Sequence, residues 1–247
     1  MVVEELRRLL PRLETIATET RALAFGLPEL DRALPQGGLA FGALHEIAPQ
    51  DARDLPCAFG FAAAILTRLP RTAPVFFVFA SRNLRFSGRP HGHGLNALGL
   101  DPARVILIET DHDKQSLWAM EETLHAGVPA TVVGIIDKEL DLKVSQRLHL
   151  AAAASGRLLL LLRPAGAIAA SAAMTRWRLR AARAACDRFG LITHACWHVT
   201  LERCRNGRPN DWLVEFDHAA HRFSLATQLA DHPLPHRTNT QGARRAG

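Results

Sequence analysis

Five runs of almost uninterrupted apolar residues constrain the fold of this chain more than any other feature. They lie at 43–48, 74–80, 104–109, 130–137 and 157–163. Four segments with helical composition separate them, at 55–69, 95–100, 115–126 and 140–154. Strands that are apolar on both faces are typical of a parallel sheet covered by helices on both sides. The sequence therefore predicts an α/β fold with a mostly parallel central sheet flanked by helices.

The pattern changes beyond Arg176. Segments 177–185, 191–203 and 212–217 alternate more between apolar and polar residues, and a turn sequence at 206–211 separates the last two. Such alternation predicts an antiparallel C-terminal hairpin at the edge of the sheet. A chain of 247 residues with 48% hydrophobic content can bury one full core. We assign residues 23–226 to a single core domain, 1–22 to an N-terminal helix and 227–247 to a flexible polar tail.

Segment 25–47 resembles the approach to the nucleotide site of RecA-type ATPases, which have a P-loop NTPase-type fold. A glycine pair at 37–38 leads to Gly42 and the first apolar run, where Glu46 and Ile47 match the strand before the phosphate-binding loop. In such ATPases that loop ends in Gly-Lys-Thr, and its N–H groups, lysine and hydroxyl hold phosphate and Mg²⁺. The resemblance implies a RecA-like fold for the core domain.

The loop expected after residue 47 has none of these phosphate-binding groups. Pro49 stands in place of its first glycine, and Asp54, Leu55 and Pro56 stand in place of Gly-Lys-Thr. The prolines lack the N–H that a phosphate would accept from, and the carboxylates of Asp51 and Asp54 repel a triphosphate. We therefore expect a degenerate Walker A loop and no nucleotide cofactor.

Two further positions bear on catalysis. The carboxylate that RecA-like ATPases place after the second strand, to activate water, falls near Ser81. Asp137 occupies a Walker-B-like place, but without a lysine and a hydroxyl we interpret it as a strand-end or helix-cap residue. We predict that ATPase activity is lost and that the chain is not an enzyme. A different site near His45, Glu46 and Asp137 stays an alternative, although His45 and Glu46 point to opposite faces of one strand.

No residue group predicts a metal site or a membrane segment. The four cysteines lack a C-x-x-C spacing, His91 and His93 lie among glycines in a surface turn, and Asp111 or Asp113 suits a helix cap. The apolar runs are far shorter than the roughly 20 residues of a bilayer span. The N-terminus does not resemble a signal peptide. We expect a cytoplasmic, nucleoid-associated protein without a metal.

Arginine supplies nearly all of the positive charge. The net charge is +6, and lysine occurs only at 114, 138 and 143. Nine arginines but only two acidic residues lie within 163–208, and Arg176, Arg178 and Arg180 share one side of a strand beside Trp177. The cluster is either a phosphate-binding face for DNA or the solvated surface of a basic protein. The candidate nucleic-acid-binding residues are Arg176, Trp177, Arg178, Arg180, Arg203, Arg205 and Arg208.

Aromatic residues and one connecting segment complete the local expectations. The tryptophans at 118, 177, 197 and 212 are expected to pack in the core or on the sheet, with Trp212 the most exposed of them. Segment 164–175 corresponds to a mobile DNA-pairing loop of RecA but is short and neutral. We therefore expect no autonomous homologous pairing.

The glycine-pair motif, the order of strands and the sequence S-A-A-M-T-R-W-R-L at 171–179 together resemble the ImuA family, over roughly residues 20–225. These are RecA-like proteins of bacterial damage-inducible mutagenesis. The resemblance implies a non-catalytic accessory role in translesion synthesis under the SOS response, beside ImuB and an error-prone C-family DNA polymerase. RecA and single-stranded or primer–template DNA are further candidate partners. The alternative is an ATP-independent single-stranded DNA-binding modulator of RecA filaments.

Both terminal segments are candidates for assembly. Residues 3–20 carry an apolar stripe opposite charged residues, and the tail contains Arg237, Arg244 and Arg245. The N-terminal helix either packs on its own sheet or docks on another protomer, on RecA or on ImuB. The sequence leaves both possibilities open.

Overall fold

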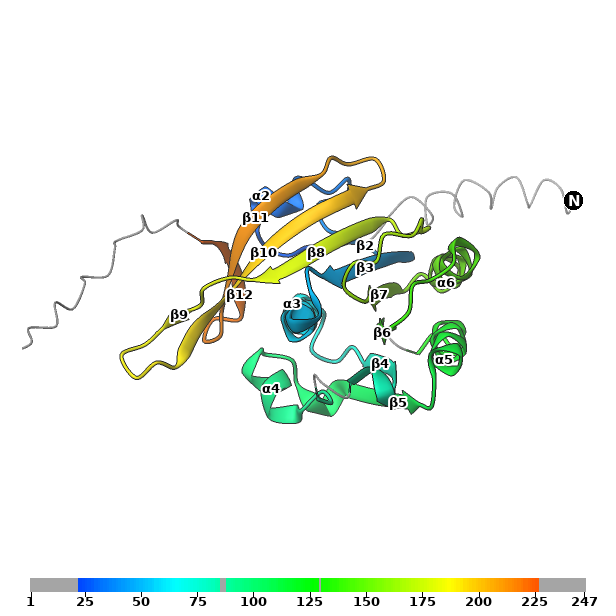
Figure 1. The fold of residues 1–247 in the computed structure, drawn as a ribbon, viewed down its shortest axis with the longest axis horizontal. Helices are drawn as coiled ribbons and strands as arrows, with labels where there is room; N and C mark the ends of the chain where they lie inside the picture. The colour runs from blue at the N-terminus through cyan, green and yellow to red at the C-terminus, as the bar shows by residue number, and fades with distance from the viewer. Residues whose placement is uncertain (1–21, 85–87, 129, 227–247) are drawn as a thin grey trace, which may run out of the picture.

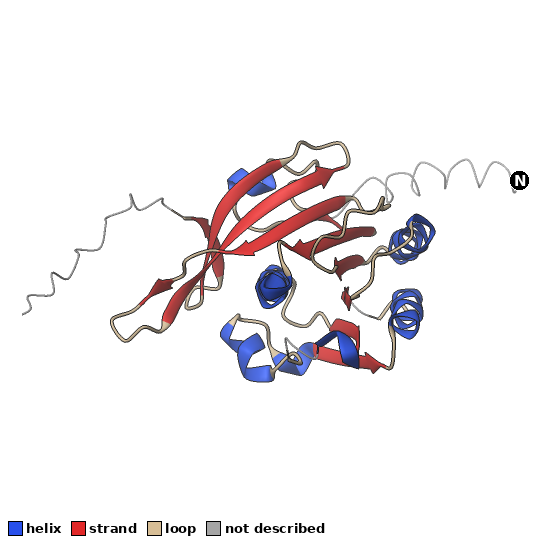
Figure 2. Cartoon of the chain, in the orientation of Figure 1, coloured by secondary structure: helices blue, strands red, loops and turns tan. Residues whose placement is uncertain are grey.

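The structure is a computed structural model that describes residues 22–226, except 85–87 and 129. The predictions for the N-terminal helix and the tail concern residues outside this range, apart from Ala22, which begins the first strand. Figures 1 and 2 show one continuous, strongly twisted sheet with helices on both faces. Within the described residues, no helix is long and apolar enough to cross a membrane.

One sheet of ten strands organises the core domain. Its order is β12-β11-β10-β8-β3-β7-β6-β4-β5, and β9 pairs with β10 beside this path. Six neighbouring strands pair in parallel: β3 (Ala43–Pro49), β4 (Val75–Ala80), β5 (Val105–Thr110), β6 (Thr131–Ile135), β7 (Leu158–Leu162) and β8 (Thr175–Ala181). The prediction of a mostly parallel central sheet is confirmed.

The antiparallel part of the sheet continues beyond β8 and is larger than the predicted hairpin. Its strands are β9 (Ala185–Cys186), β10 (Ile192–Cys204), β11 (Asn210–Asp217) and β12 (Arg222–Leu225). The long strand β10 lies between β11 on one side and β8 and β9 on the other. A separate pair, β1 (Ala22–Leu23) and β2 (Leu39–Ala40), precedes β3.

Helices cover the two faces of the parallel strands (Figure 1). On one face lie α3 (Leu55–Leu66) and α4 (Gly92–Ala97), and on the other α5 (Asp113–His125) and α6 (Leu142–Ser155); the short α2 is Pro28–Asp31. The leucines of β7 divide alternately between two cores, with Leu160 in the core against α3 and Leu159 in the core against α5 and α6. This is why the sequence of β7 is apolar at every position.

Strand β5 is an exception to the expected double burial. It is the last strand of the sheet, paired only with β4 in the described structure, and its Ile106 and Leu107 are exposed. The apolar composition was consistent with burial on both faces, but an edge strand has one neighbour and here lacks full helical cover. The strand itself is confirmed.

The prediction that the tryptophans pack in the core or on the sheet is confirmed at 177, 197 and 212 and wrong at 118, and Trp212 is not the most exposed of the four. Trp212 is buried, because its register opposite Val199 points it into the core, where its ring lies 6.3 Å from that of Trp177. Trp118 is instead 63% exposed. The buried residues of α5 are Asp113, Ser116, Ala119, Met120 and Leu124, a helical stripe that leaves Trp118 on the outer side.

The buried Met120 side chain of α5 packs directly on Gly134 of β6, so a side chain at residue 134 would collide with it. A Cβ at Gly134 would overlap the Met120 thioether and lie 2.9 Å from Leu161 Cδ1. We predict that Gly134→Ala lowers the free energy of unfolding by about 1–3 kcal/mol, because a packed core cannot accept the added volume. The measurement is urea denaturation.

The matched control is Gly94→Ala in α4, where an added Cβ meets nothing within 4 Å. That change should raise the free energy of unfolding by about 0.5–1 kcal/mol, since alanine has less backbone entropy to lose than glycine. Equal effects of the two substitutions would contradict the close packing of α5 on β6.

Candidate functional site

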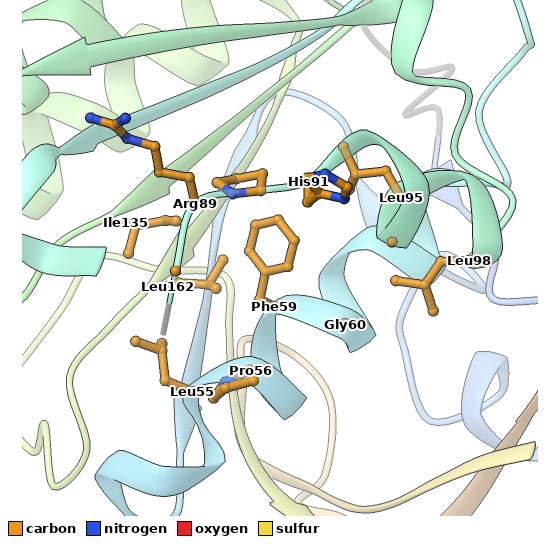
Figure 3. A pocket seen from close by; sticks show the side chains of 13 residues that line it. Leu55, Pro56, Phe59, Gly60, Arg89, His91, Leu95, Leu98, Ile135 and Leu162 are labelled. Carbon is orange, nitrogen blue, oxygen red and sulfur yellow. The ribbon is translucent and has the colours of Figure 1, made fainter. Parts of the chain in front are cut away.

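The crevice at the C-terminal ends of β6 and β7 is where an open α/β sheet usually binds its ligand. A pocket of about 220 Å³ lies there, next to the start of α3. Figure 3 shows Phe59, Ile135 and Leu162 lining it, while the guanidinium of Arg89 extends away from these apolar side chains. That guanidinium forms an ion pair with Glu109. The pocket therefore suits an apolar group rather than a triphosphate.

The residues that stand in place of the phosphate-binding loop form a turn whose carboxylates accept hydrogen bonds from backbone N–H groups of the protein. Asp51 Oδ1 accepts a hydrogen bond from Arg53 N (2.7 Å), and Asp54 Oδ1 accepts one from Ala181 N (3.0 Å) on β8. Pro49 ends β3, and Pro56 lies in the first turn of α3, where it contributes no N–H. The carboxylates of Asp51 and Asp54 thus occupy the start of α3, where a helix would otherwise attract an anion.

Asp137 lies just beyond the end of β6, and its side chain is exposed. The N-cap of α6 is Asp141, whose Oδ1 accepts from Lys143 N at 2.8 Å. The helix-cap interpretation of Asp137 is therefore wrong, and the strand-end interpretation fits its position. Within the described residues, no ion pair joins its carboxylate to another side chain.

A carboxylate that the sequence analysis did not single out lies beside Ser81. Ser81 Oγ donates a hydrogen bond to Glu109 Oε1 (2.6 Å), and Arg89 donates to the same oxygen. These bonds, from Ser81 first and then from Arg89, hold the pKa of Glu109 below its ordinary value. Glu109 is thus a paired, ionised carboxylate, which makes it a weak candidate for a general base. Finding it required knowing that β4 and β5 are neighbours.

A buried ionic cluster joins β3, β8 and the connection between β7 and β8. Glu46 Oε1 accepts hydrogen bonds from Arg163 Nη1 (2.7 Å) and Ser171 Oγ (2.8 Å), and Glu46 Oε2 accepts one from Arg176 Nε (3.0 Å). Glu46 is 1% and Arg163 2% exposed. Burial lowers the pKa of Arg163, and the Glu46 charge opposes this effect. The cluster is a structural tie between strands, because both charges lie out of reach of solvent.

This cluster changes the interpretation of the arginine strand. Besides Glu46, Arg176 binds Ala169 O (2.6 Å), and Arg178 binds both carboxylate oxygens of Glu202 (2.7 and 3.1 Å). Their guanidinium groups are thus engaged within the protein. Arg180, on the same side of β8, is exposed and has no ion-pair partner in the part of the chain that the structure describes.

Trp177 does not belong to this surface. It lies on the opposite face of β8 and is 1% exposed, with Nε1 donating to Thr175 Oγ1 (2.7 Å) and its ring packed against Phe25. Alternation along the strand, which puts the three arginines on one side, necessarily puts Trp177 on the other. Its inclusion among the candidate nucleic-acid-binding residues is therefore wrong in this structure.

The other candidate arginines lie on β10 and just after it. Arg203 pairs with Arg176 in the register of β10 and β8, so both lie on one side of the sheet. Arg203 donates to Ser171 O (2.8 Å) and, with Arg205, lines a pocket of about 420 Å³ beside His149 of α6. Arg208 lies in the turn between β10 and β11, in a different hollow that includes Glu29. Arg178 and Arg180 line a third pocket, which also contains Asp211. Arg203 therefore adjoins the arginine strand, whereas Arg208 lies in a separate hollow.

The histidines and cysteines of the described residues do not form a metal site. Within residues 22–226, gaps excepted, no three His, Cys, Asp or Glu side chains gather as a metal site would require, and the four thiols are unpaired. His91 and His93 stack on each other at 5.1 Å between ring centroids. His112 caps α5, whereas Asp113 is buried and binds Arg82 and Asn83, so the prediction of an Asp cap is wrong.

His45 makes stability depend on pH. Its ring is buried, with Nδ1 2.7 Å from Thr175 Oγ1 and Nε2 3.0 Å from Ala40 O, and burial lowers its pKa to about 4. The unfolded chain, with a histidine pKa near 6.5, binds the proton more readily. His45 therefore does not reduce the free energy of unfolding above about pH 6.5. As the pH drops from 6.5 towards 4, this group lowers the free energy of unfolding by roughly 3 kcal/mol.

The check is urea unfolding at pH 7 and pH 4 of the wild type and of His45→Gln. Between pH 7 and pH 4, the free energy of unfolding of the variant should fall by roughly 3 kcal/mol less than that of the wild type, because glutamine does not titrate. The pKa of His149 is also lowered, by burial and then by Arg205, and its contribution is common to both proteins. Identical pH profiles would contradict a buried neutral His45.

Comparison with known proteins identifies the family. No protein-family model matches the chain. Two relatives, each named Protein ImuA, come from Caulobacter vibrioides strains NA1000 / CB15N and ATCC 19089 / CIP 103742 / CB 15. Each is 33% identical over 239 residues, which span 88% of this chain and 93% of the relative. Because the similarity covers nearly the whole of both sequences, this chain belongs to the ImuA family.

Proposed function

We propose that this chain is a non-catalytic accessory protein of damage-induced mutagenesis, which acts through protein contacts without hydrolysing ATP. Membership of the ImuA family is the observation that carries the proposal, since the similarity extends over 88% of the chain. The partners that the family implies are ImuB and an error-prone C-family DNA polymerase, in translesion synthesis under the SOS response.

The chemistry of the crevice supports the non-catalytic part of this proposal. A triphosphate needs N–H donors and cations at the loop after β3. Here the carboxylates of Asp51 and Asp54 lie at the start of α3, and the adjoining pocket is lined by Phe59, Ile135 and Leu162. Bringing a triphosphate to this position would set like charges together and leave polar oxygens against carbon.

Exposed apolar side chains on α5, on α6 and on the connection between β7 and β8 support action through protein contacts. They are Trp118, Leu150 and Ile168, in that order. Ile168 is held in place, because Glu139 Oε1 accepts hydrogen bonds from Ile168 N (2.9 Å) and Ala169 N (2.7 Å). Exposed aromatic and aliphatic side chains on a rigid support are characteristic of protein-binding surfaces.

Complementation in cells tests whether catalysis is needed. In a strain that lacks this protein, Asp137→Ala should restore the frequency of damage-induced mutation to the level given by the wild type. The reason is that an accessory protein without ATPase chemistry does not need a Walker-B-like carboxylate. Immunoblotting controls for equal protein levels, and the empty vector gives the baseline.

A mutation frequency at the vector level, with normal amounts of the Asp137→Ala protein, would refute the non-catalytic proposal. A second readout tests the partner: ImuB should be retained on the immobilised wild-type chain equally with and without Mg²⁺-ATP. Retention that requires Mg²⁺-ATP would overturn the proposal in the same way, and no retention at all would remove ImuB as the direct partner.

A further inference from the structure

Strand β9 and the first residues of β10 form a narrow ribbon that projects from the sheet (Figure 1). In the described structure β9 pairs only with β10, and β11 ends at Asp217, opposite His194. Every residue from 185 to 192 is exposed. We call residues 183–192 the arm. Because no third strand among the described residues flanks its tip, the arm can enter a groove or a junction of another molecule.

The tip of the arm is preformed. Asp187 Oδ1 accepts hydrogen bonds from Phe189 N (2.8 Å) and Leu191 N (2.9 Å), and Asp187 N donates to Leu191 O (2.9 Å). Gly190 has a φ of +80°, which glycine adopts without strain. A tip fixed in this way loses little conformational entropy when it binds.

Three large apolar side chains stand exposed at this tip. Phe189 is 73%, Leu191 66% and Ile192 59% exposed. The guanidinium carbon of Arg188 lies 4.7 Å from the centroid of the Phe189 ring, which forms a flat cationic and aromatic surface. Burial of such side chains against a partner lowers the free energy of the complex, because apolar surface is removed from water.

The charges next to the tip indicate what kind of partner that is. Arg180, Arg183 and Arg188 have no carboxylate partner among the described residues, unlike Arg176 and Arg178. The one carboxylate of the arm, Asp187, is engaged by backbone N–H groups. Free arginines beside an apolar wedge are the combination with which proteins hold phosphates and stack on bases.

We propose that the arm binds single-stranded DNA, with Arg180, Arg183 and Arg188 at phosphates and Phe189 stacked on an unpaired base. An aromatic ring can stack only on a base that has left the duplex, so single-stranded DNA is favoured over double-stranded DNA. The site differs from the arginine strand that the sequence pointed to, since Arg176 and Arg178 are occupied within the protein. The proposal goes beyond the proposed function and does not depend on ImuB.

Fluorescence anisotropy with a labelled single-stranded oligonucleotide tests the proposal on the full-length chain. Phe189→Ala should weaken binding by about 5- to 140-fold, the range that corresponds to losing one stacked base. The double variant Arg183→Gln with Arg188→Gln should reduce the slope of log affinity against log salt by about 1.4, because two phosphate contacts disappear. A duplex of the same sequence should bind more weakly than the single strand.

Matched controls lie on α5, just after it, and on α6. Val128→Ala removes a side chain that is 63% exposed, close to the 66% of Leu191, and Lys114→Gln with Lys143→Gln removes two charges on α5 and α6. Both should leave the DNA affinity within about twofold, apart from a small nonspecific electrostatic effect. Because the substituted side chains are exposed, thermal unfolding should confirm that every variant is folded.

Three outcomes would overturn the proposal. The first is a wild-type chain that does not bind the oligonucleotide. The second is an arm variant that binds it as the wild type does. The third is a loss of ImuB retention in Phe189→Ala with unchanged DNA affinity, which would make the arm a protein-docking element. Failure of the accessory role itself would show in the complementation assay and is therefore distinguishable.

Discussion

The buried carboxylate of Glu46 is the interaction on which the arrangement of this protein depends. A buried charge is tolerated only when it is paired and its oxygens are hydrogen-bonded, and Glu46 meets both conditions through Arg163, Arg176 and Ser171. Arg176 lies on β8, whereas Arg163 and Ser171 lie in the connection between β7 and β8, with Arg163 directly after β7. Arg176 also binds Ala169 O, so the same guanidinium that neutralises Glu46 fixes the connecting segment.

These ion pairs determine which arginine side chains are available to bind a ligand. Arg163 and Arg176 are committed to Glu46, and Arg178 is committed to Glu202 on β10. The exposed arginines without an ion-pair partner in the described structure include Arg180 and Arg183, at the base of the arm. In the crevice, Asp51 and Asp54 lie where a phosphate would bind, next to an apolar pocket. Both observations support the proposal that the protein works through its outer surfaces.

Local patterns predicted the strands and helices, because apolar runs and helical stripes are properties of neighbouring residues. The pairing of distant residues could not be predicted in this way. Glu46 and Arg176 are 130 residues apart, and only the parallel pairing of β3 with β8 sets them side by side. Glu109 and the exposed β5 depend likewise on strand order. The arm went unnoticed because its turn lies between two segments that both resemble ordinary strands.

Hydrogen–deuterium exchange of segment 164–174 tests the central claim most directly. If Glu46 and its partners hold this connection rigid, the amides of Ile168 and Ala169, which donate to Glu139, exchange slowly in the wild type. In Glu46→Gln the exchange of these two amides becomes faster than in the wild type, because Arg163 and Arg176 lose their counter-charge. The exchange of the α5 amides serves as the reference and should change less. Fast exchange of Ile168 and Ala169 in the wild type, or no change in Glu46→Gln, would contradict the account.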